Sequence, residues 1–133
     1  VLEGDAAEYV ADPAHHATVD ALCVDLYDHD AASPVLDSEA FYKQCHRTLR
    51  EGGIMTVNLF GREASFERSR SRIASAFGAE AVFGMKATKE GNTVVGAVKQ
   101  LTWPAPSVLV ARAQNIDTRF NMSASQWLKM LDR

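Results

Sequence analysis

The sequence predicts an α/β fold in which a mostly parallel sheet carries helices on both faces and is closed at one edge by an antiparallel hairpin. The first observation is an apolar run, Val19–Val24, whose composition is typical of a strand buried on both faces. A helical pattern and a second apolar run, residues 54–60, follow over short connections and indicate a right-handed parallel crossover. Two short β-rich runs, residues 81–87 and 93–99, are separated by a turn rich in Gly and Asn and predict the hairpin.

Composition limits the classes of protein to which the chain can belong. Its 133 residues are 47% hydrophobic, which is enough apolar material for one core, and we expect a single domain over residues 1–133. A net charge of −3 argues against a nucleic-acid partner. No apolar run is long enough to cross a membrane or has the form of a signal peptide, so we expect a cytoplasmic protein with no membrane partner. The histidines show no spacing typical of a metal site, and we expect no bound metal.

The first residues predict the end of a strand, a turn at Gly4 and Asp5, and a short helix. Asp5 has two interpretations. Its carboxylate can cap the helix by accepting hydrogen bonds from the first amides, or it can accept a hydrogen bond from the exocyclic amine of an adenine. Asp12 and Pro13 end this segment, because the residue before a proline is displaced from the helical region.

Two carboxylates, Asp25 and Asp28, stand where the central apolar run stops. In an open parallel α/β sheet, ligands bind at the carboxyl ends of the strands, so Asp25 is a candidate for chemistry. The alternative is that an aspartate at the end of a strand caps a turn or a helix. Cys23 within the apolar run, and Cys45 on a helical face further on, suggest buried and reduced thiols.

A helix is expected from Asp37 or Ser38, either of which can cap it, to about residue 50, where Gly52 and Gly53 end it. Its apolar stripe, at a spacing of four residues, consists of Phe41, Cys45 and Leu49. Another helix, about residues 64–77, follows the second strand.

The last third of the chain predicts two helices after a break at residues 103–106. Ser107 can cap the first, which continues to about residue 119, and Ser123 with Gln126 forms a capping-box pattern that opens the second. We expect Trp103 and Trp127 to be anchors of the core.

Several motifs occur in an order that is more specific than any one of them. They are Gly4-Asp5-Ala6, Val24-Asp25-Leu26-Tyr27-Asp28, Gly52-Gly53 and Gly91-Asn92. Together they resemble the C-terminal two-thirds of the spermidine synthase-like branch of S-adenosylmethionine-dependent transferases. This resemblance implies a partial Rossmann-like methyltransferase fold.

The resemblance also implies roles for residues that match these motifs. Asp5 resembles the acid that binds the adenine amino group, with Ala6 lining the base and Tyr27 lining the pocket. Asp25 resembles the catalytic acid of aminopropyltransferases, and Asp28 would be the second acid. Such an enzyme transfers an aminopropyl group from decarboxylated S-adenosylmethionine to a small-molecule amine such as putrescine. A carboxylate suits this chemistry, because an amine must lose a proton to act as a nucleophile.

Two departures from the family's pattern leave alternatives open. Aminopropyltransferases have Asp-Ser-x-Asp-Pro where this chain has Asp25-Leu-Tyr-Asp28-His, which favours a methyltransferase that uses S-adenosylmethionine. The glycine-rich strands that cradle the cofactor do not precede Val1. The resemblance therefore implies a truncated domain that is inactive by itself, and the third alternative is a catalytically silent module that dimerises.

The resemblance also places strand Val19–Val24 beside a strand that this chain lacks. Its apolar edge would then be exposed, and an exposed edge favours pairing with another chain. We expect a homodimer that pairs through the edge of strand 19–24, or an N-terminal segment rearranged to cover it.

Overall fold

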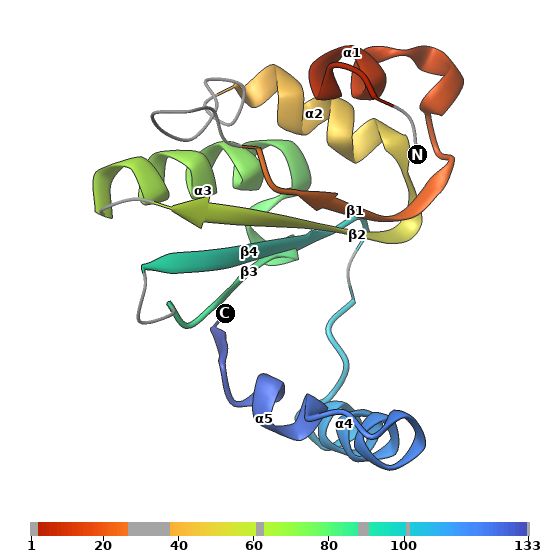
Figure 1. Ribbon diagram of the computed structural model, residues 1–133, viewed down its shortest axis with the longest axis vertical. Coiled ribbons are helices and arrows are strands. Elements are labelled where there is room, and N and C mark those ends of the chain that lie inside the picture. The colour runs from red at the N-terminus through yellow and green to blue at the C-terminus, as the bar shows by residue number, and fades with distance from the viewer. Residues whose placement is uncertain (1–2, 27–37, 61–62, 88–90, 101, 133) are drawn as a thin grey trace.

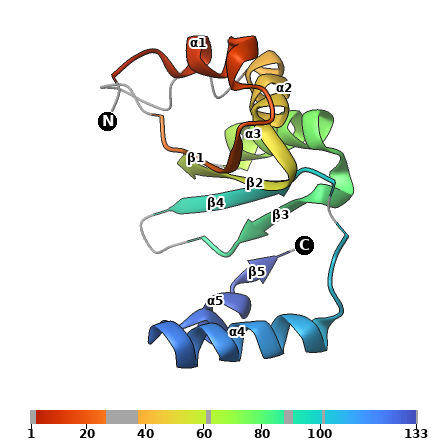
Figure 2. The ribbon, with the colours of Figure 1, turned by 90° about the vertical axis from the view of Figure 1, so that its right-hand side faces the viewer.

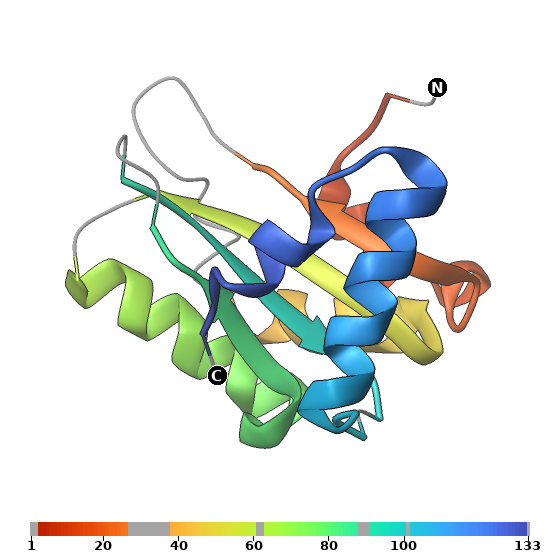
Figure 3. The same cartoon turned by 90° about the horizontal axis from the view of Figure 1, so that it is seen from below.

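The computed structural model describes residues 3–26, 38–60, 63–87, 91–100 and 102–132 (Figure 1). The fold is α/β, as predicted, with a five-stranded sheet between helices on its two sides (Figures 1 and 2). The helices on one side are α1 (Ala6–Ala11), α2 (Glu39–Thr48) and α3 (Glu63–Phe77). On the other side lie α4 (Pro106–Phe120) and α5 (Ala124–Leu128), in front of the sheet when it is seen from below (Figure 3).

The sheet has the order β1-β2-β4-β3-β5. Its strands are β1 (Val19–Val24), β2 (Leu49–Phe60), β3 (Val82–Met85), β4 (Asn92–Val98) and β5 (Leu131–Asp132). The predicted β1–α2–β2 crossover is confirmed, since β1 and β2 pair in parallel, and so is the β3–β4 hairpin. The expected predominance of parallel pairs is not seen among the described strands, where β1–β2 is the one parallel pair. The reason is that β4 inserts between β2 and β3, which run in the same direction but do not pair.

The core lies between the sheet and helices α2 and α3. Ser38 caps α2 as predicted, because its hydroxyl accepts a hydrogen bond from the Phe41 amide at 3.2 Å. Alternate residues of β2 point toward these helices, and Met55 and Val57 are fully buried. The predicted apolar stripe, which consists of Phe41, Cys45 and Leu49, is buried in the same cluster. Burial raises the pKa of the Cys45 thiol to about 12, so this cysteine is an unreactive part of the core.

The sequence suggested that Gly52 and Gly53 end helix α2, but the structure shows that they do not. Helix α2 stops at Thr48 because Leu49 already pairs with Val19 at the start of β2. The glycines form an irregular segment within β2, where the register with β1 shifts. Gly52 has a φ of +76°, and a side chain at Gly53 would begin 2.8 Å from the Arg50 carbonyl oxygen. The Gly52 amide donates to the Lys99 carbonyl oxygen at 3.0 Å, which joins the bulge to the end of β4.

Strand β1 is not buried on both faces, contrary to the prediction. Val24 is buried, whereas Leu22 is half-buried and Cys23 is exposed. The cause is the position of the strand: among the described residues, β1 pairs with β2 on one side and with nothing on the other. The predicted exposed edge of this strand is therefore present in the described part of the chain.

The C-terminal helices differ from the prediction in their caps and in their burial. Pro106 takes the first position of α4, so Ser107 lies inside the helix and does not cap it. Helix α5 starts where predicted, but the amide of Ser125 donates to the Asp117 carboxylate at 3.2 Å, and the Ser123 side chain makes no capping bond. Trp127 is 47% exposed and is not a core anchor.

Trp103 is half-buried and packs edge-on against Phe83, with 5.5 Å between the ring centroids. Its indole nitrogen donates to the Glu80 carbonyl oxygen at 3.0 Å. This tryptophan therefore ties the segment before α4 to the start of β3, although it lies outside the main buried cluster.

Candidate functional site

A cleft with a volume of about 450 Å³ is lined by residues of α1, β1 and α2 and by the segments next to them. One part of its lining comes from residues 3–6 together with Tyr9 and Val10 of α1. The other part comes from residues 22–24 and Leu26, together with Phe41 of α2. Most of these side chains are apolar, and the carboxylates of the lining belong to Glu3 and Asp5. Such a cleft suits a flat, largely apolar group that carries a few hydrogen-bonding atoms.

Asp5 lines the cleft and also caps α1. Its Oδ1 accepts hydrogen bonds from the amides of Ala7 at 2.7 Å and Glu8 at 3.0 Å, so the capping interpretation is confirmed. Within the described residues, its Oδ2 accepts no hydrogen bond from the protein. Because a carboxylate has two oxygens, the cap leaves one acceptor for a ligand. The capping and adenine-binding interpretations are therefore compatible. The predicted end of a strand falls partly on residues 1–2, which lie outside the described residues, and Glu3 and Gly4 form no strand.

Asp25 follows directly after β1 and is exposed. Its Oδ1 accepts a hydrogen bond from Nδ2 of Asn58 at 3.1 Å. The parallel register explains this contact: Val24 is the partner of Val57, so the next residue on each strand meets the other at the carboxyl ends. Asp25 also stands between Val24 and Leu26, which both line the cleft, and it is therefore at the border of that space.

The predicted site residues are partly brought together. Asp5 and Ala6 line the cleft, and Asp25 stands at its border. Tyr27 and Asp28 lie outside the described residues, so their predicted roles are untested. Asn58 was not recognised from the sequence as a partner of Asp25. A polar residue near the end of an otherwise apolar strand was the signal that could have identified it.

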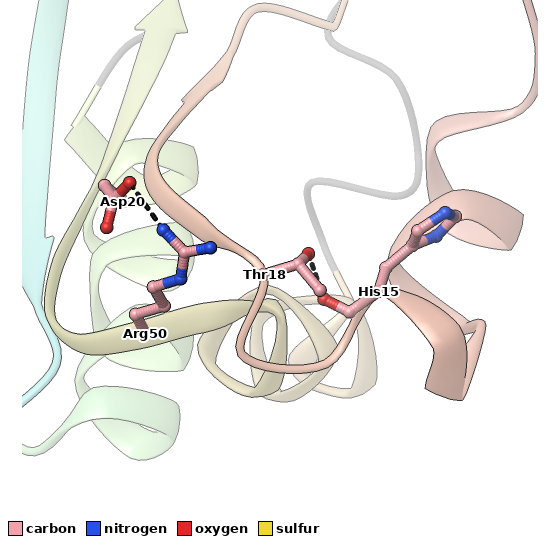
Figure 4. Close-up of polar contacts among 4 residues, drawn as sticks. All are labelled: His15, Thr18, Asp20 and Arg50. Carbon is pink, nitrogen blue, oxygen red and sulfur yellow. Dashed lines mark hydrogen bonds and ion pairs between the residues drawn. The ribbon is translucent and has the colours of Figure 1, made fainter.

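Tyr9, another residue of the lining, is held by the segment that leads into β1. Its ring stacks on His15, with 3.8 Å between the centroids. Nδ1 of His15 donates to the Tyr9 carbonyl oxygen at 2.8 Å, since a carbonyl oxygen can only accept. The hydroxyl of Thr18 donates to the His15 carbonyl oxygen at 2.7 Å (Figure 4). These contacts connect α1 to β1 and so join the two parts of the lining.

Asp20 and Arg50 form an ion pair, 2.9 Å between Oδ2 and Nη1, that links β1 to β2 (Figure 4). Both side chains are largely exposed, so the pair contributes on the order of 0–1 kcal/mol. The pair also gives Asp20, the one charged side chain of β1, a partner on the neighbouring strand.

Among the described residues, no group of three or more His, Cys, Asp or Glu residues is arranged to hold a metal ion. None of the helices in the same described ranges combines the length and the apolar character that a membrane span requires.

Comparison with known proteins gives a relative in sequence and similar solved structures. No family model matches the chain. A polyamine aminopropyltransferase of Chromobacterium violaceum is 27% identical over 135 residues, which cover 98% of this chain and 49% of the relative. The chain thus spans about half the length of the curated relative that it matches.

Two solved structures are similar in fold. One is a spermidine synthase in complex with the transition-state analogue AdoDATO, with a TM-score of 0.63 and 21% identity over 76% of this chain and 36% of that one. The other is a probable spermidine synthase from Corynebacterium glutamicum, with a TM-score of 0.54 and 19% identity over 77% and 39% of the two chains. At these identities the likeness shows the fold alone. The similarities in sequence and fold confirm the predicted resemblance to spermidine synthase-like proteins.

The capping role of Asp5 predicts two different effects of substitution. Asp5→Ala removes the acceptor for the first amides of α1 and should lower the free energy of unfolding by about 1 kcal/mol. Asp5→Asn keeps an oxygen in that position and should change it by less than half as much. Urea denaturation of the two variants and the parent chain measures the difference. Equal loss in both variants would contradict the assignment of the cap.

Proposed function

We propose that the chain carries part of an aminopropyltransferase site, which transfers an aminopropyl group from decarboxylated S-adenosylmethionine to a polyamine acceptor such as putrescine. The observation that carries the proposal is the arrangement of Asp5 and Asp25, one lining the cleft and the other at its border. The similarity to a polyamine aminopropyltransferase supports this chemistry over others that the same fold could host. We also propose that the protein acts as one domain in the cytoplasm.

In this proposal the cleft binds the adenosine part of the donor. The exocyclic amine of adenine donates to Oδ2 of Asp5, because Oδ1 is engaged by the amides of α1. The base lies against Ala6 and the apolar residues of the lining, which include Leu22 and Phe41. A carboxylate acceptor then favours adenine over a base that presents a carbonyl oxygen at that position.

Asp25 binds and orients the acceptor amine. The attacking nitrogen forms a bond to the aminopropyl carbon attached to the sulfonium, and the C–S bond breaks with its electron pair moving to sulfur. The products are methylthioadenosine and a lengthened polyamine, and the proton lost by the nitrogen passes to Asp25 or to solvent. Asn58 holds one oxygen of Asp25, which leaves the other to face the amine. Asp28 is proposed as the second acid and Tyr27 as a wall of the pocket.

Two other functions are alternatives to aminopropyl transfer. The motif Asp25-Leu-Tyr-Asp28-His lacks the Ser and Pro of aminopropyltransferases and favours a methyltransferase that uses S-adenosylmethionine. The third candidate is a catalytically silent module. The chain covers about half of its curated relative, so it need not contain every residue that the activity of the whole relative requires.

The unpaired edge of β1 supports a further part of the proposal, a homodimer that pairs through this strand. An exposed strand edge presents unpaired amides and carbonyl groups, and strands without Lys or Pro have little protection against pairing. Strand β1 has neither residue.

Calorimetric titration with methylthioadenosine and with S-adenosylhomocysteine tests the proposed donor. We expect methylthioadenosine to bind more tightly. Asp5→Asn should weaken its binding at least about tenfold, because an amide keeps the cap with its oxygen and turns an NH₂ donor toward the adenine amine. Asp12→Asn is the matched control, since Asp12 caps the turn at residues 13–15 and does not line the cleft. Tighter binding of S-adenosylhomocysteine would instead favour methyl transfer.

Asp25→Asn tests the proposed acid in a form of the protein that catalyses the transfer. Release of methylthioadenosine should slow by roughly 100-fold or more, since an amide cannot accept the proton. The free energy of unfolding should change by less than about 1 kcal/mol, because Asp25 is exposed. Asp20→Asn, which changes an exposed acid of the strand that precedes Asp25, is the control and should keep the rate. Full activity of Asp25→Asn would exclude it as the catalytic acid.

A further inference from the structure

We infer that Tyr9 is the ring on which the nucleobase stacks in the cleft, and that this contact makes the site prefer a purine to a pyrimidine. This role rests on the proposed function, because it takes the cleft as the site of the adenosine part of the donor. It adds a residue that determines which class of base the cleft accepts.

The chemistry of Asp5 leaves room for such a residue. Its Oδ2, which is not used by the helix cap, can accept a hydrogen bond from an exocyclic amine. Adenine and cytosine both carry an exocyclic amine, so this acceptor distinguishes either of them from a base with a carbonyl oxygen at that position. It does not distinguish adenine from cytosine. A preference between these two bases needs a second feature that responds to the size of the ring system.

Tyr9 stands next to that acceptor in the lining. Its amide donates to the Asp5 carbonyl oxygen at 3.0 Å, which puts the two residues one helical turn apart at the start of α1. Residues at this spacing lie on the same side of a helix, and both of these residues line the cleft. The lining therefore combines an acceptor for the edge of a base with an aromatic ring for its face.

The ring of Tyr9 is held in place by the protein itself. It stacks on His15, with 3.8 Å between the centroids and 18° between the planes. Nδ1 of His15 donates to the Tyr9 carbonyl oxygen at 2.8 Å, and the His15 carbonyl oxygen accepts from the Thr18 hydroxyl at 2.7 Å (Figure 4). Because the ring is already ordered, less conformational freedom is lost when a base stacks on it.

The second face of the ring is the one that a base can use. Among the described residues, His15 is the one aromatic ring that stacks on Tyr9, and Tyr9 is 42% exposed while it lines the cleft. Every base can stack on an aromatic side chain, but a two-ring base covers more of that side chain than a one-ring base does. The contact therefore strengthens the binding of a purine more than that of a pyrimidine.

Calorimetric titration with adenosine, cytidine and inosine tests this role, because the three nucleosides share one sugar. Tyr9→Ala should weaken adenosine binding about tenfold and cytidine binding about threefold or less, since the stack with a purine is larger. The preference for adenosine over inosine should persist, because it depends on Asp5. Tyr9→Phe keeps the ring and should bind all three as the parent chain does. Phe120→Ala removes an exposed ring of α4 outside the lining and is the control.

The outcomes separate this role from the proposed function. A Tyr9→Ala chain that binds adenosine as tightly as the parent chain overturns the stacking role and leaves the nucleoside site intact. An equal loss for adenosine and cytidine overturns the selection of purines. A parent chain that binds none of the three nucleosides overturns the nucleoside site together with the role of Tyr9.

His15 acts through Tyr9 and is therefore a positioning residue, which a double-mutant cycle tests. His15→Ala should weaken adenosine binding roughly threefold in the parent chain and leave it unchanged in the Tyr9→Ala chain, because no ring is then left to position. Equal weakening in both chains would show that His15 affects the cleft by another route and would overturn its positioning role.

NMR spectra of the unaltered chain keep the test valid if Tyr9→Ala fails to fold. At saturation with adenosine, nuclear Overhauser effects should connect the base protons H2 or H8 with the ring protons of Tyr9. Stacking should also move the signals of these base protons upfield. Overhauser effects from the base to Leu22 or Phe41, with none to Tyr9, would overturn the stacking and retain the nucleoside site.

Discussion

The parallel pairing of β1 with β2, imposed by the crossover through α2, is the constraint on which the candidate site depends. This register places Asp25 beside Asn58 at the carboxyl ends of the two strands, where the hydrogen bond between them forms. The same crossover buries one side of α2 against the sheet and directs Phe41 toward the cleft. Among the described residues β1 has no partner on its other edge, and Leu22, Cys23 and Val24 of this strand line the cleft.

The cleft has one wall from the segment around α1, which Asp5 caps, and another from β1. Contacts between Tyr9, His15 and Thr18 connect α1 to the start of β1 and keep the two walls joined. One carboxylate oxygen of Asp5 accepts hydrogen bonds from the first amides of α1, and the other oxygen remains available to a ligand. A residue whose sequence context suggests an ordinary cap can therefore also act in recognition, because the two roles use different atoms.

The sequence predicts the elements better than their surroundings. Apolar runs and turn residues are local signals, and they placed β1, the crossover and the β3–β4 hairpin correctly. Burial of β1 depends on its neighbours in the sheet, so composition alone could not show that Cys23 is exposed. Likewise Gly52 suits a helix end and a bulge equally well, and the pairing of Leu49 with Val19 decided between them.

The candidate site was predicted only in part, because local signals identify some of its residues whereas others depend on contacts between strands. Asp5 and Asp25 could be identified because they end or begin elements whose positions the motifs predict. Asn58 could not, since its contact with Asp25 depends on the register between two strands that are separated by a helix. Trp127 was assigned to the core from its residue type, but α5 packs on α4 and leaves this side chain at the surface.

The most direct test of the account is a titration of the isotopically labelled chain with methylthioadenosine, followed by amide chemical shifts in NMR spectra. The account predicts the largest changes in residues 4–10 and 22–26, which line or border the cleft, and none in α4 beyond the scatter of the measurement. Changes concentrated in α4 and α5, or no saturable change at any residue, would contradict the assignment of the cleft as the nucleoside site.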